Sequence, residues 1–218
     1  YDWKLLTQPI IFRTSSELLE NFPYSDIAVA TLWTTAPTIS QLVKAGRVQV
    51  GVYYIQDYES WFYSPTDPQR EQVKQTYPLL SHRIVKSDWL RNLLKKDGYE
   101  TKKILLGMDL DIFYPRDVTQ SEFPKILAMV RQNTPRRGFP YVIQALEMLK
   151  KVIPQAEIIL FGDDIFNFQD IPFSFRNEGI ISDRDRLARL YSEADVFLDG
   201  SNFQGFGRGG LEAMACGT

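Results

Sequence analysis

Short runs of apolar residues alternate with longer amphipathic stretches along the whole chain. This alternation is typical of parallel α/β units, because helices cover both faces of a parallel sheet and its strands therefore have no polar side. The apolar runs predict strands at residues 27–32, 48–55, 83–87, 103–106, 125–130, 157–161, 175–180 and 195–198. We therefore expect an α/β fold with parallel sheets.

Amphipathic stretches in the second half of the chain predict helices. Residues 139–151 place apolar side chains on one face, and residues 182–194 open with Ser182 and Asp185, which resemble a capping box. Residues 211–216 begin a further helix close to the last residue. Open α/β domains usually contain more strands and a closing helix, so we expect a fragment that is truncated at both ends.

A polar segment bounded by prolines separates the two series of predicted strands. Residues 115–124 show no hydrophobic periodicity, which is typical of a linker. The sequence therefore predicts two domains. Residues 1–116 would be the carboxy-terminal part of the first domain, residues 117–124 the linker, and residues 125–218 the first part of the second domain.

Composition narrows the range of partners and sites. Of the 218 residues, 44% are hydrophobic and 24% are charged, and the net charge of −2 gives no reason to expect a nucleic-acid partner. A single cysteine and a single histidine exclude a disulfide framework and the usual multi-histidine or multi-cysteine metal sites. Apolar runs are too short to cross a bilayer and no secretory signal is recognisable, so we expect a cytoplasmic location.

Two arginines lie just beyond the strand that is predicted to end at residue 130. Arg131 follows this strand directly, and Arg137 comes after a turn, immediately before a predicted helix. Ligands of open α/β sheets bind outside the carboxyl ends of the strands, so both guanidinium groups can converge on one anion such as a diphosphate. A solvated basic loop is the alternative that the spacing leaves open.

A glycine-rich turn follows the strand at residues 195–198. The glycines between residues 205 and 210 expose backbone N–H groups before a helix, an arrangement that can hold an anion, and Arg208 adds positive charge beside them. Glu212 lies about one turn inside this helix, where a carboxylate can accept hydrogen bonds from the vicinal hydroxyls of a ribose. The alternative is a plain strand-to-helix turn whose glycines serve only close packing.

The order of these residues resembles the retaining nucleotide-sugar glycosyltransferases of family 4, over residues 81–218. The matching motifs are Gly-Met-Asp at 107–109, Phe-Tyr-Pro at 113–115, the pair Arg131 and Arg137, the strand and glycine at 158–162, the runs at 179–183 and 194–197, Gly-Phe-Gly at 205–207, and Glu-Ala-Met-Ala-Cys-Gly at 212–217. This resemblance implies a GT-B fold, in which an acceptor-binding and a nucleotide-sugar-binding Rossmann-like domain follow one another.

The resemblance also implies the reaction, which is transfer of a sugar from a nucleoside-diphosphate sugar with retention of configuration. Arg131 and Arg137 would be catalytic residues that stabilise the charge on the leaving diphosphate, and no metal or other cofactor would be needed. The acceptor would be a glycan or a lipid-linked molecule in cell-surface polysaccharide synthesis. The residues implied in donor binding are Gly162, Ile180, Gln204, Gly205, Phe206, Gly207, Arg208, Gly209 and Glu212.

Several positions depart from the family pattern. Gln204 stands eight residues before Glu212, where a glutamate is usual, Arg137 stands where lysine is commoner, and Gly200 stands where a proline often occurs. No histidine is present in the loops 31–34 and 56–57, so Asp57 is the candidate for orienting the acceptor.

Aromatic residues are dense between positions 53 and 63. They could stack on acceptor sugars or belong to the core, and the sequence leaves both open. The run Tyr-Ile-Gln-Asp-Tyr-Glu at 54–59 is more narrowly similar to rhamnosyltransferases of this family.

Other functions remain open at this stage. A nucleotide-sugar 2-epimerase has the same fold and a diphosphate site, and an inactive fragment that binds a nucleotide sugar is the alternative that is not an enzyme. Lysines at 95, 96, 102 and 103 are expected to form a solvated face, with peripheral contact to the inner face of a membrane as a second possibility.

Overall fold

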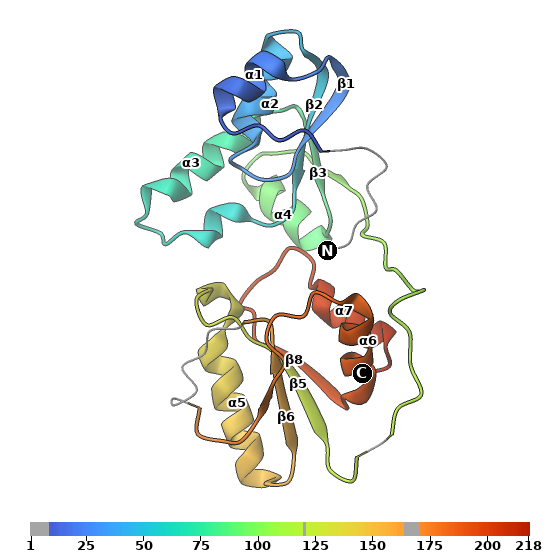
Figure 1. Cartoon of the computed structure of the whole chain (residues 1–218). Coiled ribbons are helices and arrows are strands. Elements are labelled where there is room, and N and C mark those ends of the chain that lie inside the picture. Colours follow the sequence, from blue (N-terminus) through green and yellow to red (C-terminus); the bar gives the residue numbers. More distant parts are fainter. Residues whose placement is uncertain (1–8, 120, 164–170) are drawn as a thin grey trace. The chain divides into compact units, whose positions relative to one another are not determined.

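The chain divides into two compact units in the computed structural model, which describes residues 9–119, 121–163 and 171–218 (Figure 1). The division falls between Leu106 and Gly107. Each unit contains a four-stranded sheet whose paired strands are all parallel. The expectation of an α/β fold with parallel sheets is therefore confirmed.

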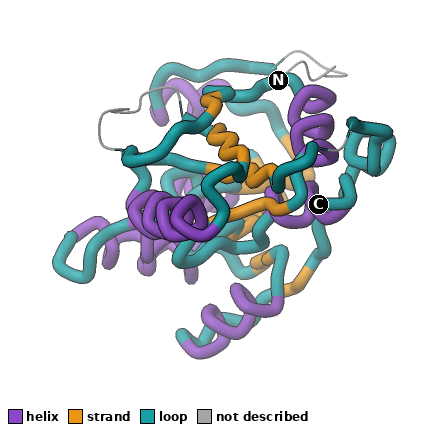
Figure 2. Tube along the Cα trace, turned by 90° about the horizontal axis from the view of Figure 1, so that it is seen from below, coloured by secondary structure: helices purple, strands orange, loops and turns teal. Residues whose placement is uncertain are grey.

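The first unit has the strand order β1-β2-β3-β4. Its strands are β1 (Ser25–Ala30), β2 (Val48–Ile55), β3 (His82–Val85) and β4 (Lys102–Lys103). Its helices are α1 (Ser15–Asn21), α2 (Ala36–Lys44), α3 (Pro68–Thr76) and α4 (Asp88–Lys96), with 3-10 turns η1 (Glu59–Phe62) and η2 (Tyr77–Leu79). Figure 2 distinguishes helices, in purple, from strands, in orange.

The core of the first unit lies between its sheet and helices α2 and α4. Leu90 and Leu94 are four residues apart on α4, so both fall on the same helix face, and both are buried. Ser87 caps this helix, because its hydroxyl oxygen accepts a hydrogen bond of 3.2 Å from the Leu90 N–H. On β1 the alternate side chains Ile27 and Val29 are exposed, so the described helices cover one face of this strand.

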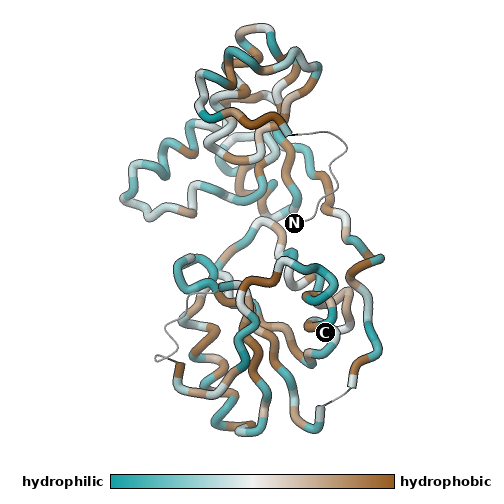
Figure 3. Tube along the Cα trace, viewed as in Figure 1, coloured by the Kyte–Doolittle hydropathy of each residue, from teal (hydrophilic) through white to brown (hydrophobic). Residues whose placement is uncertain are grey.

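The second unit has the strand order β7-β6-β5-β8. Its strands are β5 (Lys125–Met129), β6 (Glu157–Phe161), β7 (Arg176–Asn177) and β8 (Val196–Asp199). Its helices are α5 (Phe139–Val152), α6 (Arg184–Glu193) and α7 (Arg208–Ala215), with the 3-10 turn η3 (Pro135–Arg137) before α5. Figure 3 shows hydrophobic residues, in brown, along these strands.

Helices cover both faces of the second sheet. Ile126 and Ala128 pack on one face with Val142 and other residues of α5. Leu127 points to the opposite face and packs with Tyr191 of α6 and with residues of α7. Consecutive strand residues alternate between the two faces, so the two cores are separate and β5 is apolar on both sides (Figure 1).

The order in which the chain adds strands to the second sheet reverses at β5. From β5 the chain passes through α5 to β6 on one side, whereas β8 pairs with β5 on the other side. The carboxyl ends of β5 and β8 are therefore adjacent at a point where the strand order reverses. In open α/β sheets, this is the place where a crevice for ligands forms.

The predicted elements agree with the structure best where a strand is long and central. Strands β2 and β6 have the predicted bounds, whereas the stretch at 175–180 is reduced to the two residues of β7. The N-cap of α6 is Asp183, not Ser182, because the Asp183 carboxylate accepts from the N–H groups of Asp185 and Arg186. Helix α7 begins at Arg208, three residues before its predicted start.

The boundary between the units lies before the predicted linker at 117–124. Phe113 is buried among residues of the second unit, where its ring lies 6.4 Å from the ring of Tyr191. Asp109 forms an ion pair of 3.0 Å with Arg184, and Arg116 forms one of 2.9 Å with Asp185. These contacts hold the segment after Gly107 on α6, so it belongs to the second unit rather than to the first.

Candidate functional site

The candidate site lies at the carboxyl edge of the second sheet, where the loop after β5 meets the loop after β8. Gly138 has a φ of +63°, and a Cβ there would lie 1.9 Å from the carbonyl oxygen of Gly200. A Cβ on Gly200 would lie 2.5 Å from Cγ2 of Val142. The Asn202 N–H donates to the Arg136 carbonyl at 2.9 Å, so both loops also share a backbone hydrogen bond. Both glycines are therefore needed for this close approach.

Arg137 reaches from the first loop to the second. Its Nη1 donates to the hydroxyl oxygen of Ser201 at 3.3 Å and to Oε1 of Gln204 at 3.2 Å. The arginine is partly buried, and it belongs to η3, which the glycine contact holds against the loop after β8. A guanidinium group is thus fixed at the point where the strand order reverses.

Asp199 holds both partners of Arg137. Its Oδ1 accepts from the Ser201 N–H at 2.9 Å and from the Ser201 hydroxyl at 2.5 Å. Its Oδ2 accepts from Nε2 of Gln204 at 2.9 Å. Asp199 and Ser201 are site residues that the sequence did not predict. The available signal was a carboxylate at the end of a strand, immediately before the glycine-rich turn.

Arg131 lies at the same edge of the sheet but makes different contacts. It follows Val130 at the end of β5, and its side chain is exposed. Within the described part of the chain, its guanidinium group has no hydrogen-bond or ion-pair partner, and its backbone carbonyl accepts from the Thr134 N–H at 3.2 Å. Convergence of Arg131 and Arg137 on one anion therefore stays a prediction.

Arg208 and Glu212 form an ion pair on the first turn of α7. Nε of Arg208 donates to Oε1 of Glu212 at 2.9 Å. Burial raises the pKa of Glu212, and the charge of Arg208 opposes this rise. Gly207 precedes the helix with a φ of +78°. Glu212, which the sequence predicts to bind a ribose, is therefore paired with Arg208, which the sequence predicts to bind an anion.

The remaining predicted donor residues lie along the same unit. Gly162 follows β6 with a φ of +106°, and a Cβ there would lie 2.9 Å from the Val130 carbonyl oxygen. Ile180 follows β7 and is exposed. Gly205 is buried, and Phe206 and Gly209 are partly buried in the turn into α7. The predicted donor residues therefore follow β6, β7 and β8 of one sheet or lie in α7.

The first unit carries a second group of acidic residues, at the carboxyl end of β2. Asp57 is 9% exposed and accepts from the Tyr58 N–H at 3.0 Å. Glu59 is 1% exposed, and its Oε2 accepts from the Trp33 N–H at 2.7 Å and from the Tyr53 hydroxyl at 2.8 Å. Burial raises the pKa of Glu59 to about 7, although both hydrogen bonds oppose the rise.

These contacts join the two loops that the sequence assigns to the acceptor side. Trp33 belongs to the loop after β1, and Nε2 of Gln56 also donates to the Thr31 carbonyl of that loop at 3.0 Å. Glu59 is therefore a functional candidate that sequence reasoning missed. In the sequence, Glu59 is only the last residue of the run at 54–59, and nothing in the sequence indicates that it is buried.

Comparisons with known proteins identify relatives of both units. The family model described as "Glycosyl transferases group 1" matches residues 113–218. The chain is 27% identical over 203 residues to the O-antigen biosynthesis protein RfbC of Myxococcus xanthus. This match covers 90% of the chain and 15% of RfbC. The chain is also 25% identical over 169 residues to D-inositol 3-phosphate glycosyltransferase of Mycobacteroides abscessus, which covers 69% of this chain and 37% of that protein.

Solved structures match almost the whole chain. Anabaena Alr3699/HepE in complex with UDP and glucose superposes with a TM-score of 0.72 at 19% identity, over 97% of this chain and 64% of HepE. TarM superposes with a TM-score of 0.71 at 14% identity, over 93% of this chain and 42% of TarM. The chain has the GT-B fold. It spans less than two thirds of the length of these relatives, and residues 113–218 match the glycosyltransferase group 1 domain.

The aromatic residues in the first unit of this GT-B fold divide into two groups. Tyr53 and Tyr58 are buried, and the rings of both lie close to that of Tyr77, at 6.2 and 6.0 Å between centroids. Trp61 and Phe62 are 36% and 37% exposed. The core interpretation therefore holds for Tyr53 and Tyr58. Trp61 and Phe62, and the partly buried Tyr54 and Tyr63, keep exposed surface on which a sugar could stack.

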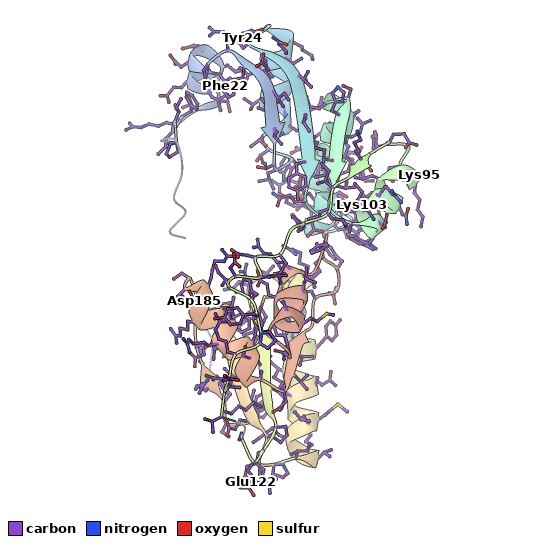
Figure 4. All side chains as sticks on the ribbon, turned by 90° about the vertical axis from the view of Figure 1, so that its right-hand side faces the viewer. Phe22, Tyr24, Lys95, Lys103, Glu122 and Asp185 are labelled. Atoms are coloured by element: carbon purple, nitrogen blue, oxygen red, sulfur yellow. The ribbon has the colours of Figure 1, made fainter. Side chains whose placement is uncertain are left out.

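Of the lysines at 95, 96, 102 and 103, Lys103 is partly buried and the other three are exposed. Lys95, on α4, is exposed, and Lys103, on β4, forms an ion pair with Asp88 (Figure 4). In the described parts of this GT-B chain, the helices are too short or too polar for a membrane span. Over the same residues, His, Cys, Asp and Glu side chains form no group of three or more that could hold a metal ion.

Proposed function

We propose that this chain is part of a retaining glycosyltransferase of family 4, which transfers a sugar from a nucleoside-diphosphate sugar to a glycan or lipid-linked acceptor. The observation that carries the proposal is Arg137, held by Ser201 and Gln204 at the strand-order reversal of the second sheet. This is the position at which a fixed positive charge can bind the diphosphate of a donor. The match of residues 113–218 to the group 1 glycosyltransferases supports it.

In this reaction, negative charge builds up on the leaving diphosphate while the anomeric carbon becomes cation-like. A guanidinium group that is already in place stabilises this charge without reorganisation, and one such contact contributes about 3 kcal/mol. Arg137 would provide this contact, and exposed Arg131 could turn toward the same anion. We further propose that these arginines neutralise the diphosphate without a metal ion.

The other donor and acceptor contacts follow from the same arrangement. Glu212 would accept hydrogen bonds from the ribose hydroxyls beside its ion pair with Arg208, and Gln204 would face the donor sugar. Asp57, at the carboxyl end of β2, is the proposed acceptor-side residue. Because RfbC is named for O-antigen biosynthesis, we propose a role in cell-surface polysaccharide synthesis, at the cytoplasmic side of the membrane. A rhamnosyl donor is the narrower proposal, from the run at 54–59.

The first experiment measures nucleotide binding by isothermal titration calorimetry of the 218-residue chain with UDP, GDP, ADP and dTDP. One of the four should bind, with UDP a candidate because HepE was crystallised with it. Arg137→Ala should weaken binding about ten- to hundredfold, because a charge-assisted contact is lost. Arg189→Ala, which removes an exposed arginine of α6, is the matched control and should bind like the wild type.

Product analysis then identifies the reaction. The protein, given the bound nucleotide's sugars and a glycan acceptor, should extend the acceptor. Conversion of the donor without an acceptor would instead indicate the 2-epimerase. If none of the nucleotides binds, or if Arg137→Ala binds as tightly as the wild type, the assignment of the donor site is wrong.

A further inference from the structure

The amide of Gln204 lies between two groups of opposite charge. Its Nε2 donates to Oδ2 of Asp199 at 2.9 Å, and its Oε1 accepts from Nη1 of Arg137 at 3.2 Å. An amide has one donor end and one acceptor end, and the reverse orientation would place each end against a group of its own kind. Asp199 and Arg137 together therefore fix which way this amide points.

Ser201 is constrained in the same manner. Its hydroxyl donates to Oδ1 of Asp199 at 2.5 Å, which uses its single proton. The hydroxyl oxygen can then act only as an acceptor, and Nη1 of Arg137 donates to it at 3.3 Å. The carboxylate of Asp199 thus turns two neutral side chains into acceptors that face the same guanidinium nitrogen.

A glutamate at position 204 would be incompatible with this arrangement. One of its oxygens would take the place of Nε2, at hydrogen-bond distance from Oδ2 of Asp199. Two ionised carboxylates at this separation repel one another, so one of them must bind a proton. The choice of an amide at 204 therefore follows from the carboxylate at 199.

We propose that Asp199 is a positioning residue for the diphosphate site: it orients Ser201 and Gln204 so that Arg137 is held in place, and it requires an amide rather than a carboxylate at position 204. This inference rests on the proposed function, since Arg137 is the group that would contact the ligand. Asp199 acts through its two neighbours and need not touch the donor.

The test is a double-mutant cycle of Asp199→Asn and Gln204→Glu, with binding of UDP, GDP, ADP and dTDP measured by titration calorimetry at pH 5 and pH 8. Gln204→Glu alone should weaken binding about tenfold or more at pH 8 and less at pH 5, where one carboxylate binds a proton. The double variant should recover affinity to within about threefold of the wild type, because the amide that Asp199→Asn introduces can donate to a carboxylate at 204.

Thermal unfolding without ligand provides a readout that does not depend on binding. Gln204→Glu should lower the melting temperature at pH 8 more than at pH 5, and adding Asp199→Asn should restore it. Asp195→Asn is the matched control: it removes a carboxylate at the opposite end of β8, one that accepts from the Lys125 N–H at 2.7 Å, and it should leave nucleotide affinity unchanged.

The outcomes separate the two proposals. If the wild type binds nucleotide and the effects of Asp199→Asn and Gln204→Glu simply add, the positioning role is wrong while the proposed function stands. If the wild type binds none of the four nucleotides, the role of Asp199 in binding is overturned together with the proposed diphosphate site. Recovery of both affinity and melting temperature in the double variant supports the inference.

Discussion

Glu59 provides a test of the first unit that depends on one buried carboxyl group. The side chain is 1% exposed, and burial raises its pKa from 4.5 to about 7. The Tyr53 hydroxyl and the Trp33 N–H both donate to the same oxygen, so a protonated Glu59 can accept both hydrogen bonds through its carbonyl oxygen. Glu59→Gln keeps an oxygen for both donors and removes the titration.

The sign of the pH dependence follows from the raised pKa. The folded state binds the Glu59 proton more tightly than the unfolded state does, so this group contributes most to stability below pH 4.5. Its contribution is lost as the pH rises from 4.5 through 7. One unit of pKa is worth about 1.4 kcal/mol. The contribution of Glu59 to the free energy of unfolding should therefore fall by about 3 kcal/mol across this range in the wild type. The Glu59→Gln variant should lack this loss.

Tryptophan fluorescence during urea unfolding is a suitable assay, because Trp33, Trp61 and Trp89 belong to the first unit and no tryptophan follows residue 106. At each pH, the free energy of unfolding of the wild type should be subtracted from that of Glu59→Gln, because this difference removes the titration of other groups. The difference should favour the variant by about 3 kcal/mol more at pH 8 than at pH 4.5. Glu100→Gln, at an exposed glutamate, should give a flat difference. If the difference for Glu59→Gln also did not change with pH, Glu59 would ionise in the folded state as readily as in the unfolded state, and the reasoning would be refuted.

Two further predictions concern the second unit. Gly200→Ala should lower stability by about 1–3 kcal/mol in scanning calorimetry, because its Cβ would lie 2.5 Å from a methyl group of Val142 and must displace it. Gly210→Ala, within α7 and with no atom within 4 Å of the added Cβ, is the control and should not destabilise the fold. Arg208→Ala should raise the pKa of Glu212 further, since Arg208 opposes the effect of burial. The melting temperature of that variant should therefore fall more steeply than that of the wild type between pH 5 and pH 8, and equal slopes would contradict the pairing.

The fold was predictable where local pattern and burial agree. Strands β2 and β6 lie inside their sheets and are apolar almost without interruption, so their bounds could be predicted. Helix α3 was not predicted, because its sequence is polar almost throughout and it buries only Val73 and Thr76. The unit boundary was placed too late because Phe113 packs on Tyr191, and a contact between residues so far apart in sequence leaves no local pattern.

The candidate site was predictable as a set of positions but not as a set of contacts. Spacing predicted Arg137 just before a helix and the glycine-rich turn between a strand and a helix, and the structure has η3 before α5 and the turn between β8 and α7. Nothing in the spacing indicated that Asp199 would hold Ser201 and Gln204, because these contacts depend on side-chain orientation within a turn. Nor could the sequence show that Arg208 and Glu212, one helical turn apart, would pair with each other.

Three departures from the glycosyltransferase pattern meet at one place in the structure. Arg137 donates to two acceptors through Nη1, Gly200 leaves room for the loop that carries this arginine, and Gln204 accepts from it through an amide that Asp199 orients. Loss of function would let such positions change independently of one another. Here each departure fits the geometry that the others create, which argues against a degenerate domain. Under the proposed function, these departures describe one altered donor site, in which the negative charge that is usual at position 204 lies at position 199 instead.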